Sequence, residues 1–205
     1  MKKVAINGLG RIGRLVLRQY CENKSKDVEI VAVNDLVSPE NLAYLLRFDS
    51  VHGRTPYPVT VKGNEILMNE SRFPIYAEKD PARLPWQELG VDVVLECTGL
   101  FTKRDLAAKH VDAGAKRVII SAPSPTADVT IVPGVNDHQL DPGKHQVISL
   151  ASCTTNSLAP PLKVLHDNFG VEHVMVTTVH AYTVSQALVD GRPKNNDEAE
   201  RPLYR

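Results

Sequence analysis

The sequence is poor in cysteine and has no excess of charge of either sign, and each shortage excludes a class of protein. Lys plus Arg and Asp plus Glu number 24 each, so no net positive field attracts nucleic acid or an anionic membrane. The three cysteines are odd in number and unequally spaced, which fits neither a disulfide framework nor a four-ligand zinc site. We therefore expect thiols, no bound metal and no nucleic-acid partner.

Long apolar runs are also missing. No apolar stretch has the length of a membrane span, and Met-Lys-Lys leads directly into a strand-like segment with no apolar signal region before it. The chain shows no internal repeat. We expect a cytoplasmic protein without a membrane partner. Its 205 residues, 42% of them hydrophobic and 23% charged, suffice for one good core and part of a second.

The first quarter of the chain predicts a βαβ unit. An apolar run at 4–6 stops at a glycine cluster, and residues 14–20 then place apolar side chains on one helical face. A second strand is predicted at 28–33. A helix should open near Ser38, which is a suitable cap, with Pro39 in its first turn.

The following hundred or so residues continue this alternation. Residues 57–75 alternate in type around Lys62-Gly63-Asn64, a good hairpin turn, and are predicted to form a small antiparallel addition. Further strands are expected at 91–96, 117–121, 129–132 and 146–150, with a helix at 103–113. The predicted fold class is α/β, a Rossmann-type doubly wound and mainly parallel sheet.

The pattern changes after residue 151. A helix is predicted from Cys153 to about Phe169, bent or loosened by Pro160-Pro161. Residues 171–180 then predict the first strand of a second, α+β domain, and 191–205 are polar and predict a loop. We therefore predict a first domain over residues 1–151 and part of a second over 152–205.

A glycine cluster predicts a dinucleotide site. Gly8, Gly10 and Gly13 match the pattern G-x-G-x-x-G, follow a strand and open a helix. The first permits a tight turn, the second lets backbone approach a pyrophosphate, and the third allows helix and strand to pack closely. Asp35, about 20 residues further on, can accept hydrogen bonds from ribose hydroxyls and would repel a 2′-phosphate, which favours NAD over NADP. A purely structural turn is the alternative.

One cysteine has the surroundings of a nucleophile. Cys153 follows the strand at 146–150 and begins a helix, whose N-terminal N–H groups and dipole stabilise a thiolate. His180, at the end of the next apolar segment, is the natural base to pair with it. Cys21 and Cys97 are interpreted as small buried hydrophobes. The other histidines are interpreted as surface or hydrogen-bonded structural residues: His52, His110, His138, His145, His166 and His173.

Several segments in order resemble one family. The hexapeptide Ala-Ser-Cys-Thr-Thr-Asn at 151–156 resembles the active-site segment of glyceraldehyde-3-phosphate dehydrogenases, and the likeness extends from Val4 to about Asp190. Further matching segments are 5–14, 33–35, 49–53, 97–101, 120–123 and 177–183. The resemblance implies an NAD-dependent, phosphorylating enzyme of glycolysis, with an NAD-binding domain at 1–151 and part of a catalytic domain at 152–205.

The resemblance also implies roles for single residues. The thiolate of Cys153 would attack glyceraldehyde 3-phosphate to give a thiohemiacetal, with His180 as base. A thioester would follow, and inorganic phosphate would release 1,3-bisphosphoglycerate. Substrate contacts would come from Ser152, Thr154 and Thr183, and further cofactor contacts from Arg11, Ile12, Lys79, Thr98 and Ser121. Lys79 departs from the pattern, because Arg is common there and has a different donor geometry.

The resemblance leaves alternatives open. Family members continue through a second domain that supplies further substrate and subunit contacts, and residues 191–205 match the family's inter-subunit loop poorly. An erythrose-4-phosphate dehydrogenase shares the cysteine motif. A truncated, non-catalytic fragment that binds NAD or a partner is the hypothesis from another class. A homo-oligomer, a tetramer in the family, is implied only by resemblance.

Overall fold

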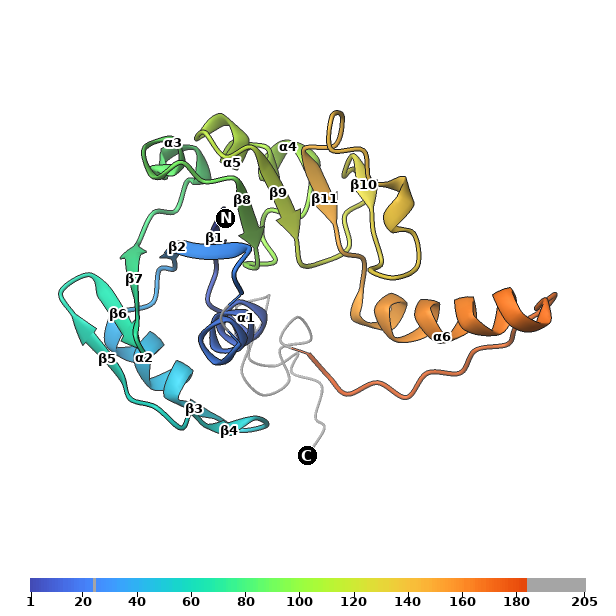
Figure 1. Cartoon of the computed structure of the whole chain (residues 1–205), viewed down its shortest axis with the longest axis horizontal. Coiled ribbons are helices and arrows are strands. Elements are labelled where there is room, and N and C mark those ends of the chain that lie inside the picture. The colour runs from blue at the N-terminus through green and yellow to red at the C-terminus, as the bar shows by residue number, and fades with distance from the viewer. Residues whose placement is uncertain (24, 184–205) are drawn as a thin grey trace, which may run out of the picture. The chain divides into compact units, whose positions relative to one another are not determined.

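Nine strands of the described residues form one sheet, and its order is that of a doubly wound fold. The computed structural model describes residues 1–23 and 25–183, and the chain divides into two compact units, 1–168 and 169–205. The strand order is β10-β11-β9-β8-β1-β2-β7-β6-β5 (Figure 1). Its strands are β1 (Lys2–Asn7), β2 (Val28–Asn34), β5 (Val59–Lys62), β6 (Glu65–Met68), β7 (Ser71–Tyr76), β8 (Val93–Glu96), β9 (Arg117–Ile120), β10 (Val129–Thr130) and β11 (Val147–Ser149).

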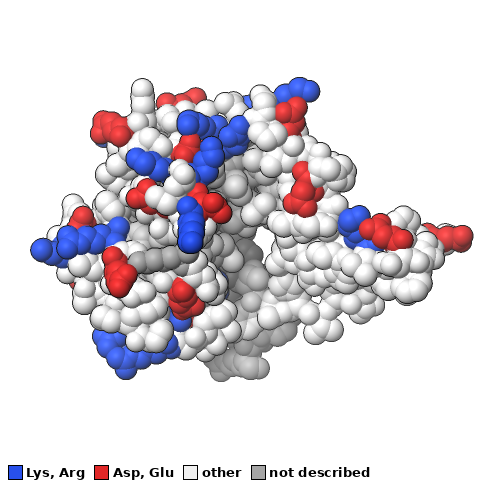
Figure 2. Space-filling view, viewed as in Figure 1, with Lys and Arg blue, Asp and Glu red and all other residues white. Residues whose placement is uncertain are grey.

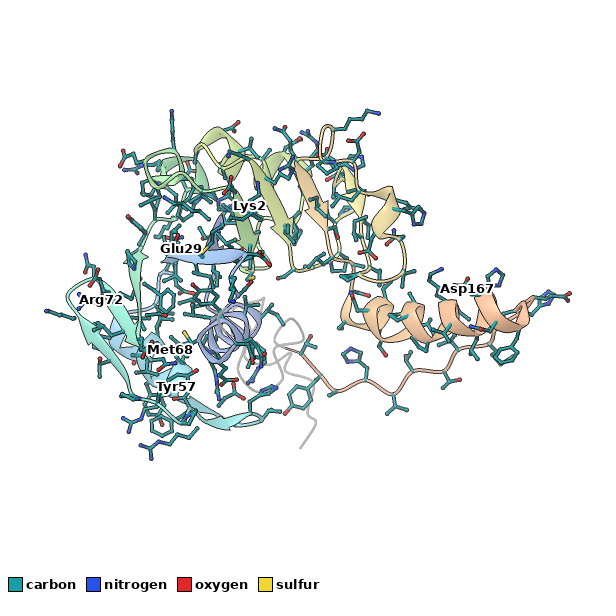
Figure 3. The ribbon with its side chains drawn as sticks, in the orientation of Figure 1. Lys2, Glu29, Tyr57, Met68, Arg72 and Asp167 are labelled. Carbon is teal, nitrogen blue, oxygen red and sulfur yellow. The ribbon has the colours of Figure 1, made fainter. Side chains whose placement is uncertain are left out.

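The sheet is mainly parallel, as the sequence predicts. All neighbours from β10 to β7 pair in parallel, and β7, β6 and β5 then pair antiparallel. The predicted hairpin is confirmed, because β5 and β6 join through the turn at 63–64. Figure 3 labels three residues of this addition, namely Tyr57, the buried Met68 of β6 and the exposed Arg72 of β7. A separate two-stranded sheet pairs β3 (Phe48–Asp49) with β4 (Gly53–Arg54).

Two cores lie on opposite faces of the sheet, because successive strand residues point to opposite sides. Ile6 belongs to a core with α1 (Arg11–Glu22) and α2 (Pro39–Arg47), whereas the preceding Ala5 belongs to another. That second core includes Trp86, from α3 (Trp86–Leu89). Burial on both faces explains why the strands read as continuous apolar runs.

The start of α2 follows from its sequence as predicted. The side chain of Ser38 accepts a hydrogen bond from the N–H of Asn41, and Pro39 occupies the first turn, where no intrahelical donor is needed.

Figure 2 shows Lys and Arg interspersed with Asp and Glu on the visible face. Within the part of the chain that the structure describes, no helix is long and apolar enough to cross a membrane.

Several predicted elements are shorter than expected. The strands predicted at 91–96, 117–121 and 146–150 each lose one or two end residues, and two further elements change more. The helix at 103–113 is divided at Ala108 into α4 (Arg104–Ala107) and α5 (Lys109–Asp112), because the Val111 N–H bonds to the Ala108 carbonyl only three residues back, at 2.7 Å. The strand at 129–132 ends at Thr130. Asn136 is the cause, since its side chain binds the Thr130 carbonyl at 2.9 Å and the Val132 N–H at 2.7 Å.

The prediction of a strand at 171–180 is wrong. The helix α6 (Cys153–Phe169) forms as predicted and includes Pro160 and Pro161, but the following described residues, 170–183, have no regular secondary structure. A strand is held by hydrogen bonds to a neighbouring strand, and no neighbour for this segment lies among the residues described. Residues 184–205, including the predicted loop at 191–205, lie outside the described residues.

Candidate functional site

The candidate site begins where adjacent parallel strands end together. Asn34, Asn7 and Glu96 are the last residues of β2, β1 and β8, and they are paired in register across the sheet. Ligands of open α/β sheets bind in the crevice outside such carboxyl ends. The residues that directly follow β1, β2 and β8 therefore form the walls of a crevice.

A cavity of about 450 Å³ occupies this crevice. That volume is within the range of small-molecule and cofactor sites. Five residues predicted to bind the cofactor line it, namely Gly8, Gly10, Asp35, Lys79 and Thr98. The other lining residues are Asn7, Asn34, Leu36, Glu78, Cys97, Leu100 and Phe101.

The three glycines of the turn are required for different reasons. Gly8 has φ +91°, which favours glycine, and Gly13 packs so closely that an added Cβ would lie 2.0 Å from the Gly8 carbonyl oxygen. Gly10 has φ −66°, which any residue can adopt, and an added Cβ would meet nothing within 4 Å. The fold therefore explains Gly8 and Gly13, whereas Gly10 leaves open space at the start of α1.

The N-terminus of α1 suits an anion. Gly10 is its N-cap and has no side chain to accept hydrogen bonds, and the first turn carries no acidic residue. The unsatisfied N–H groups and the helix dipole favour negative charge there. Gly10 lines the cavity, so a phosphate in the cavity could reach these groups.

The carboxylate of Asp35 is fixed against the glycine turn, in the lining of the same cavity. One oxygen accepts the N–H of Leu9 at 2.6 Å and the other accepts the N–H of Val37 at 2.9 Å. A carboxylate offers about four acceptor positions, so two stay available for hydroxyl donors. The residue is half-buried at the end of β2, where its prediction from sequence placed it.

The remaining predicted cofactor residues lie outside the cavity lining. Arg11 and Ile12 are exposed at the start of α1, and the Arg11 guanidinium bonds Asp49 at 2.8 Å. Burial alone raises the pKa of Asp49, but the N–H groups of His52 and Val51 and the charge of Arg11 hold it well below its usual range. This pair joins the first residue of α1 to the end of β3.

Ser121 lies just beyond the cavity. It follows β9, and its N–H bonds the carbonyl of Glu96 at 3.0 Å. Its side chain also bonds the thiol of Cys97. Burial raises the pKa of Cys97 to about 11, an effect that this hydrogen bond only partly offsets. Cys97 therefore stays a thiol at neutral pH, in agreement with its interpretation as a small hydrophobe.

Sequence reasoning missed a buried polar network beneath the cavity. Asn7, Asn34, Glu96 and His110 are each at most 4% exposed, and their side chains bond one another. The sequence carried one signal, because an amide or acid ends each of three apolar strands. The interpretation of His110 as a hydrogen-bonded structural residue is confirmed, since its ring bonds Trp86 and Glu96.

Cys153 is exposed in the first turn of α6, as the helix prediction requires. Ser152 caps this helix, because its hydroxyl accepts the N–H of Thr155 at 3.0 Å and also bonds the hydroxyl of Thr154 at 2.9 Å. The side chain of Asn156 donates to the Leu150 carbonyl at 2.7 Å. These bonds hold the thiol at the helix N-terminus, where the dipole favours a thiolate.

The residue before this cap is held in an unusual conformation. Ala151 has φ +60°, in the left-handed region that favours glycine, and is buried. Its N–H bonds the Ser149 hydroxyl at 3.1 Å. Positive φ in a residue with a Cβ persists only where its surroundings fix it, and such strain gathers at functional sites.

The predicted partner of the cysteine lies in the second unit. His180 and Thr183 are exposed in the segment at 170–183, whereas Cys153 belongs to the first unit. The pairing of the thiol with the imidazole, and the contact of Thr183 with substrate, stay predictions. Among the described residues, no group of three or more His, Cys, Asp or Glu side chains is arranged to hold a metal ion.

Comparison with known proteins gives consistent matches along the chain. Residues 2–104 match the family model "Glyceraldehyde 3-phosphate dehydrogenase, NAD binding domain", and residues 152–201 match its C-terminal domain. The glyceraldehyde-3-phosphate dehydrogenase of Geobacillus stearothermophilus is 56% identical over 188 residues, covering 92% of this chain and 56% of the relative. Those of Kitasatospora aureofaciens and Thermotoga maritima are 54% and 51% identical, each over 93% of this chain and 57% of the relative. The chain spans little more than half the length of these relatives.

Proposed function

The chain belongs to the glyceraldehyde 3-phosphate dehydrogenase family, and on this basis we propose that it provides the NAD site and the reactive cysteine for phosphorylating oxidation of glyceraldehyde 3-phosphate. The observation that carries the proposal is the open space at Gly10, beside a helix N-terminus and a fixed Asp35 carboxylate in one cavity. The fold needs no glycine there, and a pyrophosphate does. No observation favours erythrose 4-phosphate as the substrate.

The residues of the cavity fit NAD. A pyrophosphate would bind the N–H groups at the start of α1, where a Cβ at Gly10 would fill the space it needs. The two remaining acceptor positions of Asp35 suit the two hydroxyls of a ribose and oppose a 2′-phosphate. Leu36, Leu100 and Phe101 offer an apolar lining for a flat base. When bound, NAD supplies the hydride acceptor that oxidation of an aldehyde requires.

The chain's own chemistry centres on Cys153. Its thiolate attacks the aldehyde carbon to form a C–S bond, and the alkoxide formed by this attack takes a proton from the imidazolium of His180. The hydroxyl returns this proton to the neutral imidazole during oxidation to the thioester, in which NAD would accept the hydride. Inorganic phosphate then attacks the thioester carbon, the C–S bond breaks, and the acyl phosphate leaves with the thiolate restored. The N-terminus of α6 stabilises both the thiolate and the oxyanion that forms beside it.

The proposal extends to the other predicted contacts and to assembly. Ser152, Thr154 and Thr183 contact substrate or phosphate, and Arg11, Ile12, Lys79, Thr98 and Ser121 complete the cofactor surroundings. The boundary between the cofactor domain and the catalytic part falls between residues 151 and 152. The protein acts in the cytoplasm as a homo-oligomer, with NAD, glyceraldehyde 3-phosphate and phosphate as its small-molecule partners.

Two measurements on the 205-residue chain test this function. Isothermal titration calorimetry should detect NAD binding and a weaker affinity for NADP. With NAD, phosphate and glyceraldehyde 3-phosphate, formation of NADH should be seen at 340 nm, and Cys153→Ser should abolish it while NAD affinity is retained. A chain that binds neither dinucleotide contradicts the cofactor proposal. A chain that binds NAD but makes no NADH supports instead the non-catalytic fragment.

A further inference from the structure

His110 lies at a junction between the cavity wall and the helices behind it. Its ring is fully buried and is 6.4 Å from the ring of Phe101, edge to face, and 6.2 Å from the indole of Trp86. Phe101 lines the cavity, whereas Trp86 begins α3 and is part of the second core. His110 thus contacts both the wall and its support.

The hydrogen bonds around His110 allow only one arrangement of protons. The Trp86 indole N–H is a donor only, so the His110 Nδ1, at 2.9 Å, must be the acceptor. The ring proton is therefore on Nε2, which donates to the Glu96 carboxylate at 3.1 Å. A second proton on the ring would break the bond to Trp86.

Glu96 transmits this arrangement to the cavity wall. One of its oxygens accepts from His110 and, at 2.6 Å, from the Asn7 amide. The other accepts both the N–H of Thr98, at 2.8 Å, and the Thr98 hydroxyl. All four acceptor positions of the carboxylate are filled, and the hydroxyl of Thr98 in turn accepts the N–H of Leu100 at 3.0 Å. The buried carboxylate of Glu96 therefore fixes the conformation of the cavity wall at 98–101.

The same network reaches the opposite wall. The oxygen of the Asn7 amide accepts from Asn34 at 2.7 Å. Asn34 in turn binds both the N–H and the carbonyl of Glu78, at 2.9 Å each, and Glu78 lines the cavity beside Lys79. The amide of Asn7 thus joins two walls that come from strands on either side of β1.

From these contacts we propose that Glu96 and His110 are positioning residues for the cofactor: they hold the wall at 98–101 in its binding geometry and fasten it to Trp86. This inference rests on the proposed function, because the ligand it serves is NAD. Neither residue is part of the cavity lining. Their effect is to set Thr98 and Phe101 in place before binding, so that the wall need not be ordered when NAD arrives.

The test compares two substitutions of His110. His110→Gln keeps a neighbouring acceptor and donor, as in the tautomer found here, whereas His110→Phe keeps a ring and removes both. We expect His110→Phe to weaken NAD binding roughly tenfold in calorimetry, the size of effect expected when buried hydrogen-bonding groups lose their partner. His110→Gln should restore most of the affinity. Thr55→Val is the matched control, because it removes a buried hydroxyl bond, to the Tyr57 carbonyl, away from the cavity.

The outcomes separate this inference from the proposed function. If wild type binds NAD and His110→Phe binds it equally well, His110 stabilises the core only and the inference is wrong. The same conclusion follows if Thr55→Val loses as much affinity as His110→Phe. If wild type does not bind NAD, both proposals fail.

A measurement on the wild-type chain covers the case in which His110→Phe does not fold. Trp86 is the only tryptophan of the sequence, so its indole N–H gives a single resonance in an ¹H–¹⁵N spectrum. ADP-ribose should shift this resonance at saturation, because the indole is joined to the wall through His110 and Glu96. An unmoved resonance at saturating ADP-ribose overturns the inference.

Discussion

Adding one methyl group at Gly10 and at Gly13 should separate cofactor binding from folding. Both glycines lie in the same turn, yet their surroundings differ in kind. At Gly13 an added Cβ would lie 2.0 Å from the Gly8 carbonyl oxygen, 3.1 Å from its carbon and 3.2 Å from Ile6 Cγ2. At Gly10 it would meet nothing within 4 Å.

The magnitudes follow from these distances. For Gly13→Ala, helix and turn must separate by about 1.4 Å to reach the 3.4 Å of ordinary contact. The two nearest atoms, the carbonyl oxygen and carbon of Gly8, belong to the backbone and cannot turn aside. Such overpacking lies at the upper end of its usual range, about 3 kcal/mol. For Gly10→Ala, the loss of a preferred N-cap residue and the smaller entropy of the unfolded chain offset each other, so stability should change by less than about 0.5 kcal/mol. The methyl group nevertheless occupies the space for a pyrophosphate, and NAD affinity should fall at least about tenfold.

Urea unfolding and calorimetry on the same samples measure both effects. We expect Gly13→Ala to lower the urea midpoint strongly. Gly10→Ala should keep the wild-type midpoint and lose NAD affinity. Wild-type affinity in Gly10→Ala would refute the assignment of the pyrophosphate to the start of α1. A wild-type midpoint in Gly13→Ala would refute the packing argument.

Three further predictions concern pH, reactivity and backbone strain. The ammonium of Lys116, 2.6 Å from the Asp92 carboxylate, and the N–H of Lys3 lower the pKa of Asp92 to about 2. The charged carboxylate therefore stabilises the fold above about pH 4, and this contribution is lost as the pH falls towards 2. Asp92→Asn should lower the free energy of unfolding in urea by about 1 kcal/mol at pH 7 and leave it unchanged near pH 2. If the difference between variant and wild type were the same at both pH values, the charge of Asp92 would be excluded as its cause. Iodoacetamide at pH 7 should label the exposed Cys153 long before Cys97, because burial raises the pKa of Cys97 to about 11. Peptide mass spectrometry measures both rates, and equal rates would contradict the proposal that Cys153 is the reactive cysteine. Ala151→Val should lower the free energy of unfolding by at least about 2 kcal/mol, because φ +60° suits a β-branched residue poorly, while Ala151→Gly should not, and a harmless Val would refute the strain.

The sequence predicted the sheet well, because its signals are local and repeat along the chain. Apolar runs followed by glycine or by Asn-Asp locate β1, β2 and the crevice edge without any tertiary information. Predictions failed where one distant side chain decides the outcome. Asn136 ends β10 by binding Thr130 and Val132, and no periodicity in 129–132 carries that information.

The candidate site divides in the same way. The glycine turn and Asp35 could be read from the sequence, because each glycine has a local reason or leaves space for a ligand. The roles of Asn7, Glu96 and His110 could not be read, since their hydrogen-bond partners lie as far apart as 89 residues along the chain. A buried histidine at the start of a short helix has the same sequence signature whether it packs against a core or supports a cavity wall.

The conformation of Ala151 shows most directly why part of the cysteine site lies beyond sequence reasoning. Alanine in the left-handed region costs about 1 kcal/mol or more relative to an extended conformation, so the local sequence alone would not choose it. Two hydrogen bonds fix the peptide group between Leu150 and Ala151 and so impose it: Ser149 accepts the Ala151 N–H, and Asn156 donates to the Leu150 carbonyl. Because this turn joins β11 to α6, those contacts also determine where the N-terminus of α6 points. We therefore expect the proposed reactivity of Cys153 to depend on Asn156, although that side chain has no part in the proposed chemistry.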